Sequence, residues 1–129
     1  MQIFWGRLML FAVLVELLSS VSFIISLSAL TPENIEGIRS FALTHRYWLG
    51  PSLGLFFTFI ASYINGKLMF KYQVRNGVAL GILIVLIDLL CLIFGLVMFS
   101  WVFILSNVLK ILASIAGGWC SKKSDPRLG

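Results

Sequence analysis

The chain has 129 residues, of which 60% are hydrophobic and 12% are charged, and its mean hydropathy is +1.02. A water-soluble globular domain carries about 25% charged residues, so this composition excludes that class and predicts an integral membrane protein. The formal net charge of +5 comes without a basic stripe or a nucleic-acid-binding motif. We therefore expect contact with the anionic inner leaflet of a lipid bilayer, and no nucleic acid partner.

Four apolar segments follow one another along the chain, at about residues 8–30, 47–66, 77–99 and 101–119. Each is near the roughly 20 residues that a helix needs to cross about 30 Å of hydrocarbon. The last two adjoin without a proline or a charged turn, and we expect a fold-back near residues 97–102 because a single helix would be too long. The sequence therefore predicts an all-α integral membrane protein, with four transmembrane helices in one compact bundle that forms a single domain over residues 1–129.

The distribution of basic residues predicts the orientation. If the N-terminus is cytoplasmic, the outer loop at 31–46 holds only Arg39 and Arg46, and seven basic residues fall on the inner side. Basic residues are enriched in cytoplasmic loops, so we expect a multi-pass protein of the cell membrane with both termini in the cytoplasm. The seven are Arg7, Lys67, Lys71, Arg75, Lys122, Lys123 and Arg127.

The outer loop contains helix-start signals. Thr31 is a candidate N-cap and Pro32 follows at the first helical position, where proline is favoured. Ile35 and Ile38 then fall on one face. We expect a short helix that lies on the outer membrane interface, either as an ordered connector or as a lid.

Two pairs of segments have similar sequences. The first segment reads VLVELLSS around Glu16 and the third reads VLIDLLCL around Asp88. The second reads IASYING at 60–66 and the fourth reads LASIAGG at 112–118.

We interpret these matches as a duplicated helical hairpin, with repeat 1 over about residues 8–70 and repeat 2 over about residues 77–123. Each unit contains two spans, so the second starts on the same side of the membrane as the first. That makes a parallel repeat, related by an axis along the membrane normal. Chance similarity between apolar helices is the alternative.

Three ionisable residues interrupt the apolar segments. Counted at 1.5 Å per residue from the inner boundary, Glu16, Asp88 and Lys110 are each about 13–17 Å deep. A lone charge at the midplane costs about 2.5–3.5 kcal/mol, so we expect the three to meet as an ion cluster. If Lys110 pairs with one carboxylate, the other lacks a cation, and the cluster should hold a proton or attract a cation.

Small and hydroxyl-bearing residues recur at helical spacing on the faces that carry these charges. Such residues let membrane helices approach closely and hydrogen-bond to one another, so we expect them to line the bundle interior or a homodimer contact. This polar seam consists of Ser19, Thr58, Ser62, Asn65, Asn107 and Ser114.

The sequence offers little for enzymatic chemistry. His45 is the only histidine and has no second ligand at metal spacing, so we expect no metal site. Cys91 and Cys120 lie in or beside the third and fourth segments toward the reducing side, where a disulfide is not expected. No nucleophile–base pair or phosphate loop occurs, and we expect neither catalytic residues nor a cofactor.

Two functions remain open from the sequence. The first is a proton- or cation-coupled transporter that uses Glu16 and Asp88 as exchangeable sites and Lys110 as counter-ion or gate. The second is a non-catalytic membrane scaffold or assembly subunit, in which the buried charges fix helix packing or recruit a partner membrane subunit.

Overall fold

The computed structural model describes residues 5–30, 36, 49–68, 72–96 and 99–124, except the side chains of residues 27 and 30. Its helices are α1 (Trp5–Leu30), α3 (Leu49–Leu68), α4 (Gln73–Ile93) and α5 (Trp101–Lys123). The predicted all-helical fold is confirmed for these residues. Apart from Glu36, the predicted interfacial helix of the outer loop lies outside the described residues.

Three of the helices are long and apolar enough to cross a membrane, judged by length and composition. They are α4, α5 and the Trp5–Ser26 part of α1. The helix α3 is not among them, so the prediction of four spans is confirmed for three helices only. The physical reason is the composition of α3, where Thr58, Asn65 and Lys67 interrupt the apolar residues.

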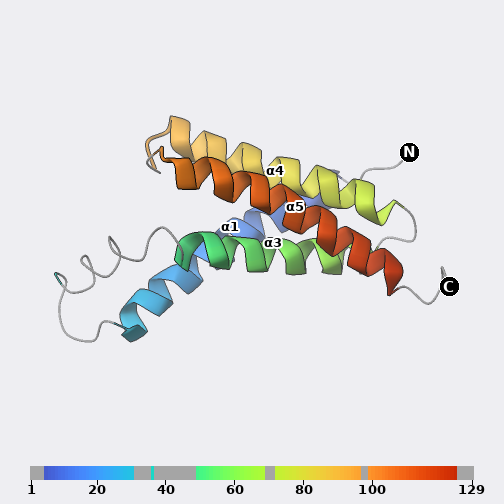
Figure 1. Cartoon of the computed structure of the whole chain (residues 1–129), viewed down its shortest axis with the longest axis horizontal. Helices are drawn as coiled ribbons and strands as arrows, with labels where there is room; N and C mark the ends of the chain where they lie inside the picture. Colours follow the sequence, from blue (N-terminus) through green and yellow to red (C-terminus); the bar gives the residue numbers. More distant parts are fainter. Residues whose placement is uncertain (1–4, 31–35, 37–48, 69–71, 97–98, 125–129) are drawn as a thin grey trace.

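The helices run alternately in opposite directions (Figure 1). The start of α1, the end of α3, the start of α4 and the end of α5 gather at one end of the bundle. We call this the terminal end and the other the opposite end. The parallel course of α3 and α5 also follows from their contacts, because Ser62 meets Ser114 and Gly66 meets Ser121.

Glycines bring α5 very close to α3 and α4. A Cβ atom on Gly117 would lie 2.5 Å from the carbonyl oxygen of Phe59 on α3. A Cβ atom on Gly77 of α4 would lie 2.6 Å from the carbonyl oxygen of Ser114 on α5. Real Cβ contacts are longer than this, so only glycine permits these backbones to touch.

The chain turns between α4 and α5 by two capping motifs. Gly95 has a φ of 72°, and the backbone N–H groups of Gly95 and Leu96 donate to the carbonyls of Leu92 and Cys91, at 3.1 and 2.9 Å. This Schellman motif ends α4 at Ile93, earlier than the predicted residue 99. Ser100 then caps α5, since its hydroxyl accepts a hydrogen bond from the N–H of Phe103 at 3.3 Å.

The apolar core is small and lies between α1, α3 and α4. Its members are the buried residues Leu8, Ala12, Val15, Ala61, Ala79, Leu80 and Ile84. Many large apolar side chains are instead exposed on the outside of the bundle. That distribution suits a helix bundle surrounded by lipid, in which the exterior is as apolar as the interior.

Candidate functional site

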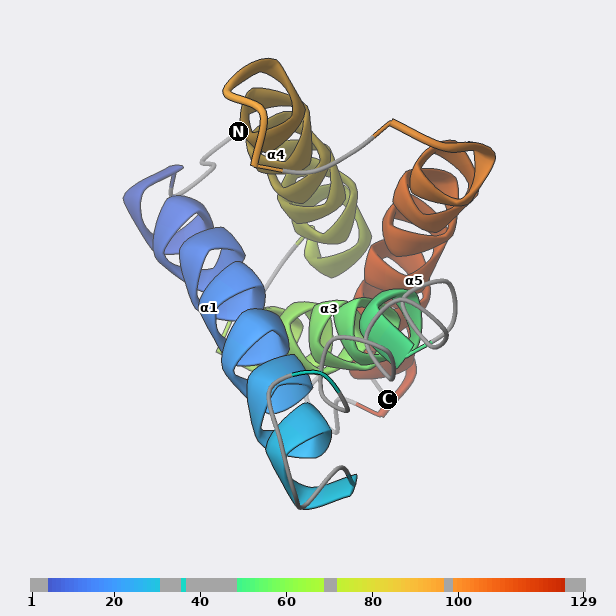
Figure 2. The ribbon, with the colours of Figure 1, turned by 90° about the vertical axis from the view of Figure 1, so that its left-hand side faces the viewer.

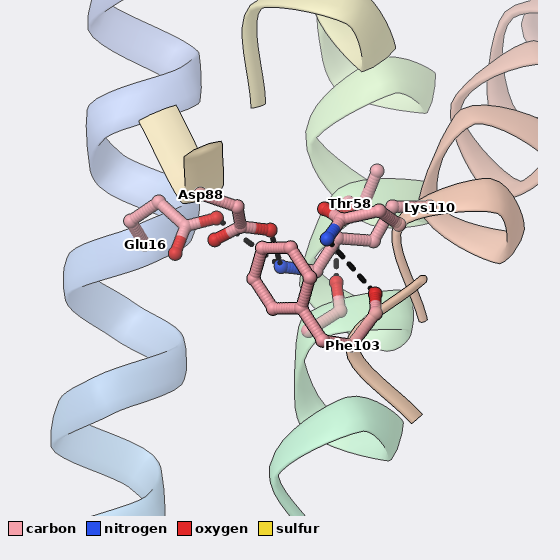
Figure 3. A network of polar contacts seen from close by, with 7 residues as sticks. Glu16, Thr58, Asp88, Phe103 and Lys110 are labelled. Carbon is pink, nitrogen blue, oxygen red and sulfur yellow. Dashed lines mark hydrogen bonds and ion pairs between the residues drawn. The ribbon is translucent and has the colours of Figure 1, made fainter. Parts of the chain in front are cut away.

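Lys110 joins three helices through two ion pairs. Its Nζ atom on α5 lies 2.6 Å from Oδ2 of Asp88 on α4 and 3.3 Å from Oε1 of Glu16 on α1. Figure 3 shows both carboxylates directed toward this single ammonium group. The structure thus brings together the three predicted residues, and Lys110 is shared between the two acids instead of serving one of them.

The three side chains differ in exposure. The exposed fraction of the side chain is 9% for Lys110, 13% for Asp88 and 23% for Glu16. The shorter ion pair is therefore also the more buried, and Glu16 combines the longer contact with the greater access. Because a low dielectric strengthens the attraction between charges, the Lys110–Asp88 pair is the tighter half of the cluster.

Two residues of α3 shape the space that Lys110 occupies. A Cβ atom on Gly54 would lie 2.8 Å from Cε of Lys110, so the lysine stem passes directly over the glycine. One turn along, the Thr58 hydroxyl donates to the Gly54 carbonyl at 2.6 Å, and Thr58 lies beside the lysine in Figure 3. The Thr58 hydroxyl thus donates its hydrogen bond within α3. The ammonium group of Lys110 is paired with the two carboxylates.

Most of the predicted polar seam is buried. Thr58, Ser62, Asn65, Asn107 and Ser114 are buried, while Ser19 is half-buried. The Ser62 hydroxyl donates to the Ser114 carbonyl, and the Ser114 hydroxyl donates to the Gly77 carbonyl at 2.5 Å. These two bonds link α3, α5 and α4 in one layer.

Several atoms of the seam lack a hydrogen-bond partner within the described part of the chain. Asn107 donates from Nδ2 to the Phe103 carbonyl at 2.9 Å, but its Oδ1 atom accepts nothing. Both amide atoms of Asn65 and the hydroxyl of Ser19 are also unpartnered. Buried polar groups are nearly always hydrogen-bonded, so each of these requires an explanation.

Sequence reasoning missed three further buried polar residues near the terminal end. Gln73, Asn76 and Ser121 are each 2% exposed or less. A signal was present, since Ser121 follows Ser114 by seven residues on the same helical face.

The cluster contains two acidic groups and one basic group. Two carboxylates and one ammonium group carry a surplus of one negative charge when all three are ionised, and a proton or a monovalent cation would neutralise it. Among the described residues, no three His, Cys, Asp or Glu side chains gather as a metal site. Cys91 and Cys120 are both free thiols.

Comparison with models of protein families, with curated proteins and with solved structures finds no match to this chain.

Proposed function

We propose that this chain is a small multi-pass membrane transporter whose ion cluster exchanges a proton or a monovalent cation during transport. The observation that carries the proposal is the sharing of one ammonium group by two carboxylates, at 2.6 and 3.3 Å. An uncompensated charge inside a membrane costs about 2.5–3.5 kcal/mol, so the surplus negative charge favours uptake of a positive one. A group that can be neutralised and recharged is what coupled transport requires.

Within this proposal the two acids have different roles. Asp88 holds Lys110 in the shorter and more buried pair, which fixes α4 against α5. Glu16 makes the longer contact and is the more accessible of the two acids. Glu16 is therefore the exchangeable site. Lys110 is the counter-ion, and its ion pair with Glu16 weakens or strengthens as Glu16 exchanges its cation.

The proposal places the cluster near the middle of the membrane. Counted from the terminal ends of their helices, Glu16, Asp88 and Lys110 are about 17–23 Å along the axis at 1.5 Å per residue. We propose that α3 also crosses the membrane, because its polar residues Thr58, Ser62 and Asn65 are covered by protein. A helix that buries its polar face against neighbours can lie in lipid despite a low mean hydropathy.

The duplicated hairpin also belongs to the proposal. If a two-fold axis along the membrane normal relates the two repeats, residues at equivalent positions near the axis lie at the same depth in the membrane and can contact one another. The aligned residues Ser62 and Ser114 are hydrogen-bonded, and the aligned Glu16 and Asp88 contact the same nitrogen. Both contacts support descent from a repeated unit.

We further propose that the protein lies in the cell membrane with both termini in the cytoplasm. The terminal end carries Arg7, Lys67, Arg75, Lys122 and Lys123 in or beside the helix ends, and basic residues favour the cytoplasmic face and its anionic lipids. A homodimer would supply further contacts for the exposed apolar faces.

A scaffold or assembly subunit is the second candidate, and one contact favours it. The helix α1 packs against α3 and α4, and the Lys110–Glu16 pair ties it to α5 as well. Buried ion pairs can fix helix register without any turnover. In that case the protein would co-purify with a partner subunit and lose it when Lys110 is changed.

Reconstitution separates the two functions. Purified protein in liposomes, with a pH-sensitive dye inside, should dissipate an imposed proton or sodium gradient when candidate substrates are added. Glu16→Gln should abolish this flux while the protein stays folded. Glu36→Gln is the matched control, because Glu36 is an exposed carboxylate outside the cluster. Flux that survives Glu16→Gln would refute the proposed role of the cluster.

A further inference from the structure

Burial divides the bundle into two halves at the level of the ion cluster. Buried residues of α1 lie from Leu8 to Val15, ahead of Glu16, and those of α4 lie from Gln73 to Ile84, ahead of Asp88. From one helical turn beyond the cluster to the opposite end, none of the described residues of the four helices is buried. Figure 2 faces that end and shows the helix ends spread apart. We call the two parts the packed half and the open half.

A single layer separates the ion cluster from the rest of the packed half. Ser114 is four residues beyond Lys110, about 6 Å along α5 toward the terminal end. Here the Ser62 and Ser114 hydroxyls donate to carbonyls of the neighbouring helices, and Gly77 and Gly117 bring the backbones into contact. We call these four residues the serine–glycine layer. Contact this close leaves no passage between α3, α4 and α5.

Unpartnered polar groups lie on the far side of that layer. Asn65 is 1% exposed, and neither its Nδ2 nor its Oδ1 atom has a hydrogen-bond partner among the described residues. Asn76 Oδ1 and the Ser121 hydroxyl, also buried, share this condition. Such groups are costly in a closed apolar interior, where they lose water and gain nothing in return. They are explained if water reaches them in another conformation.

We propose that the contact between α3, α4 and α5 in the packed half is a gate, closed in this structure with the serine–glycine layer as its innermost seal, and that this gate opens to water at the terminal end. Opening would hydrate Asn65, Asn76 and Ser121 and would connect the ion cluster to that side of the membrane. The layer is suited to this because two hydroxyl–carbonyl bonds and the contacts of two glycines hold α3, α4 and α5 together there. The purpose of the gate rests on the proposed transport, but its opening can be measured independently.

Cysteine accessibility tests the gate without any transport assay. In a background with Cys91→Ala and Cys120→Ala, reaction of Asn65→Cys with a water-soluble methanethiosulfonate would be compared with two controls. Lys123→Cys is exposed at the same end, and Ala12→Cys is fully buried in the apolar core. Minor conformers are populated at about 0.1–10%, so Asn65→Cys should react about 10- to 1,000-fold more slowly than Lys123→Cys and still outpace Ala12→Cys. A rate no faster than that of Ala12→Cys would overturn the gate.

A reversible cross-link tests whether the gate controls flux. A Cβ atom on Gly81 of α4 would lie 3.1 Å from Cβ of Ser114 on α5, so a shift of a few tenths of an ångström would allow a disulfide in Gly81→Cys/Ser114→Cys. Flux through the double variant should be lost on oxidation and return on reduction, while each single variant should be insensitive to oxidant. Equal flux in both redox states would refute the gate. Labelling of Asn65→Cys as predicted, together with a wild-type protein that moves no ion, would uphold the gate and refute the proposed transport.

Discussion

Replacement of Lys110 by methionine isolates the charge of the cluster, because methionine keeps an apolar stem of similar length. The Glu16 and Asp88 oxygens that contact Nζ are at most about 6 Å apart, and at an effective dielectric of about 20 their mutual repulsion is about 3 kcal/mol. This agrees with the roughly 3–5 kcal/mol that is lost when one member of a buried pair is removed. Because both acids are partly exposed, we expect Lys110→Met to lower the free energy of unfolding by about 3 kcal/mol, the lower end of that range.

A second substitution makes this prediction specific. Lys110→Met combined with Asp88→Leu removes the repulsion as well as the ammonium group, so the double variant should recover at least about half of the lost free energy of unfolding. The measurement is unfolding in mixed detergent micelles, followed by circular dichroism, for the wild type, both single variants and the double variant. Losses that simply add, or a Lys110→Met loss below about 1 kcal/mol, would show that the three groups are not coupled.

Three further predictions follow from the same geometry. Gly54→Ala should destabilise the protein by about 1–3 kcal/mol, because its Cβ would press on the Lys110 stem at 2.8 Å; the control Gly50→Ala meets nothing within 4 Å and should show no such loss in the same unfolding assay. Asp88→Asn should cost more free energy of unfolding than Glu16→Gln, since it removes the shorter and more buried ion pair, and an equal or reversed order would assign the structural role to Glu16. Thiol labelling in intact cells should reach Glu36→Cys and Tyr72→Cys, both at exposed positions on either side of α3, from opposite faces of the membrane; labelling of both from one face would mean that α3 does not cross.

The sequence allowed the helices and the residues of the cluster to be predicted from elementary counting. Apolar segments of span length produced four helices, and equal depth along three of them suggested that Glu16, Asp88 and Lys110 could meet. The sharing of Lys110 was not predictable, because it depends on ångström-scale distances between three helices. The crossing of the membrane by α3 stays a prediction, because Thr58, Asn65 and Lys67 lower the mean hydropathy of this helix.

The ends of helices were predicted least well. Gly95 lies just past the last turn of α4, where a left-handed residue commonly ends a helix, and Ser100 is a typical N-cap. Both signals were readable in the sequence. The unpartnered state of Asn65, by contrast, depends on which side chains of α4 and α5 reach it, and spacing along one helix does not contain that information.

The cover of α3 by α5 has a consequence for biosynthesis. If α3 crosses the bilayer as proposed, the polar side chains of Thr58, Ser62 and Asn65 emerge from the ribosome well before α5, which begins at Trp101. At that moment α5 has not yet been synthesised, although it provides the Ser114 carbonyl that accepts the Ser62 hydrogen bond and it covers this face of α3. On insertion scales each polar group entering lipid alone opposes partitioning, so α3 should wait at the translocation machinery or at the membrane surface. Chains truncated before Trp101 should therefore be recognised as incomplete and degraded, and α5 should act as the helix that commits the whole protein to the membrane.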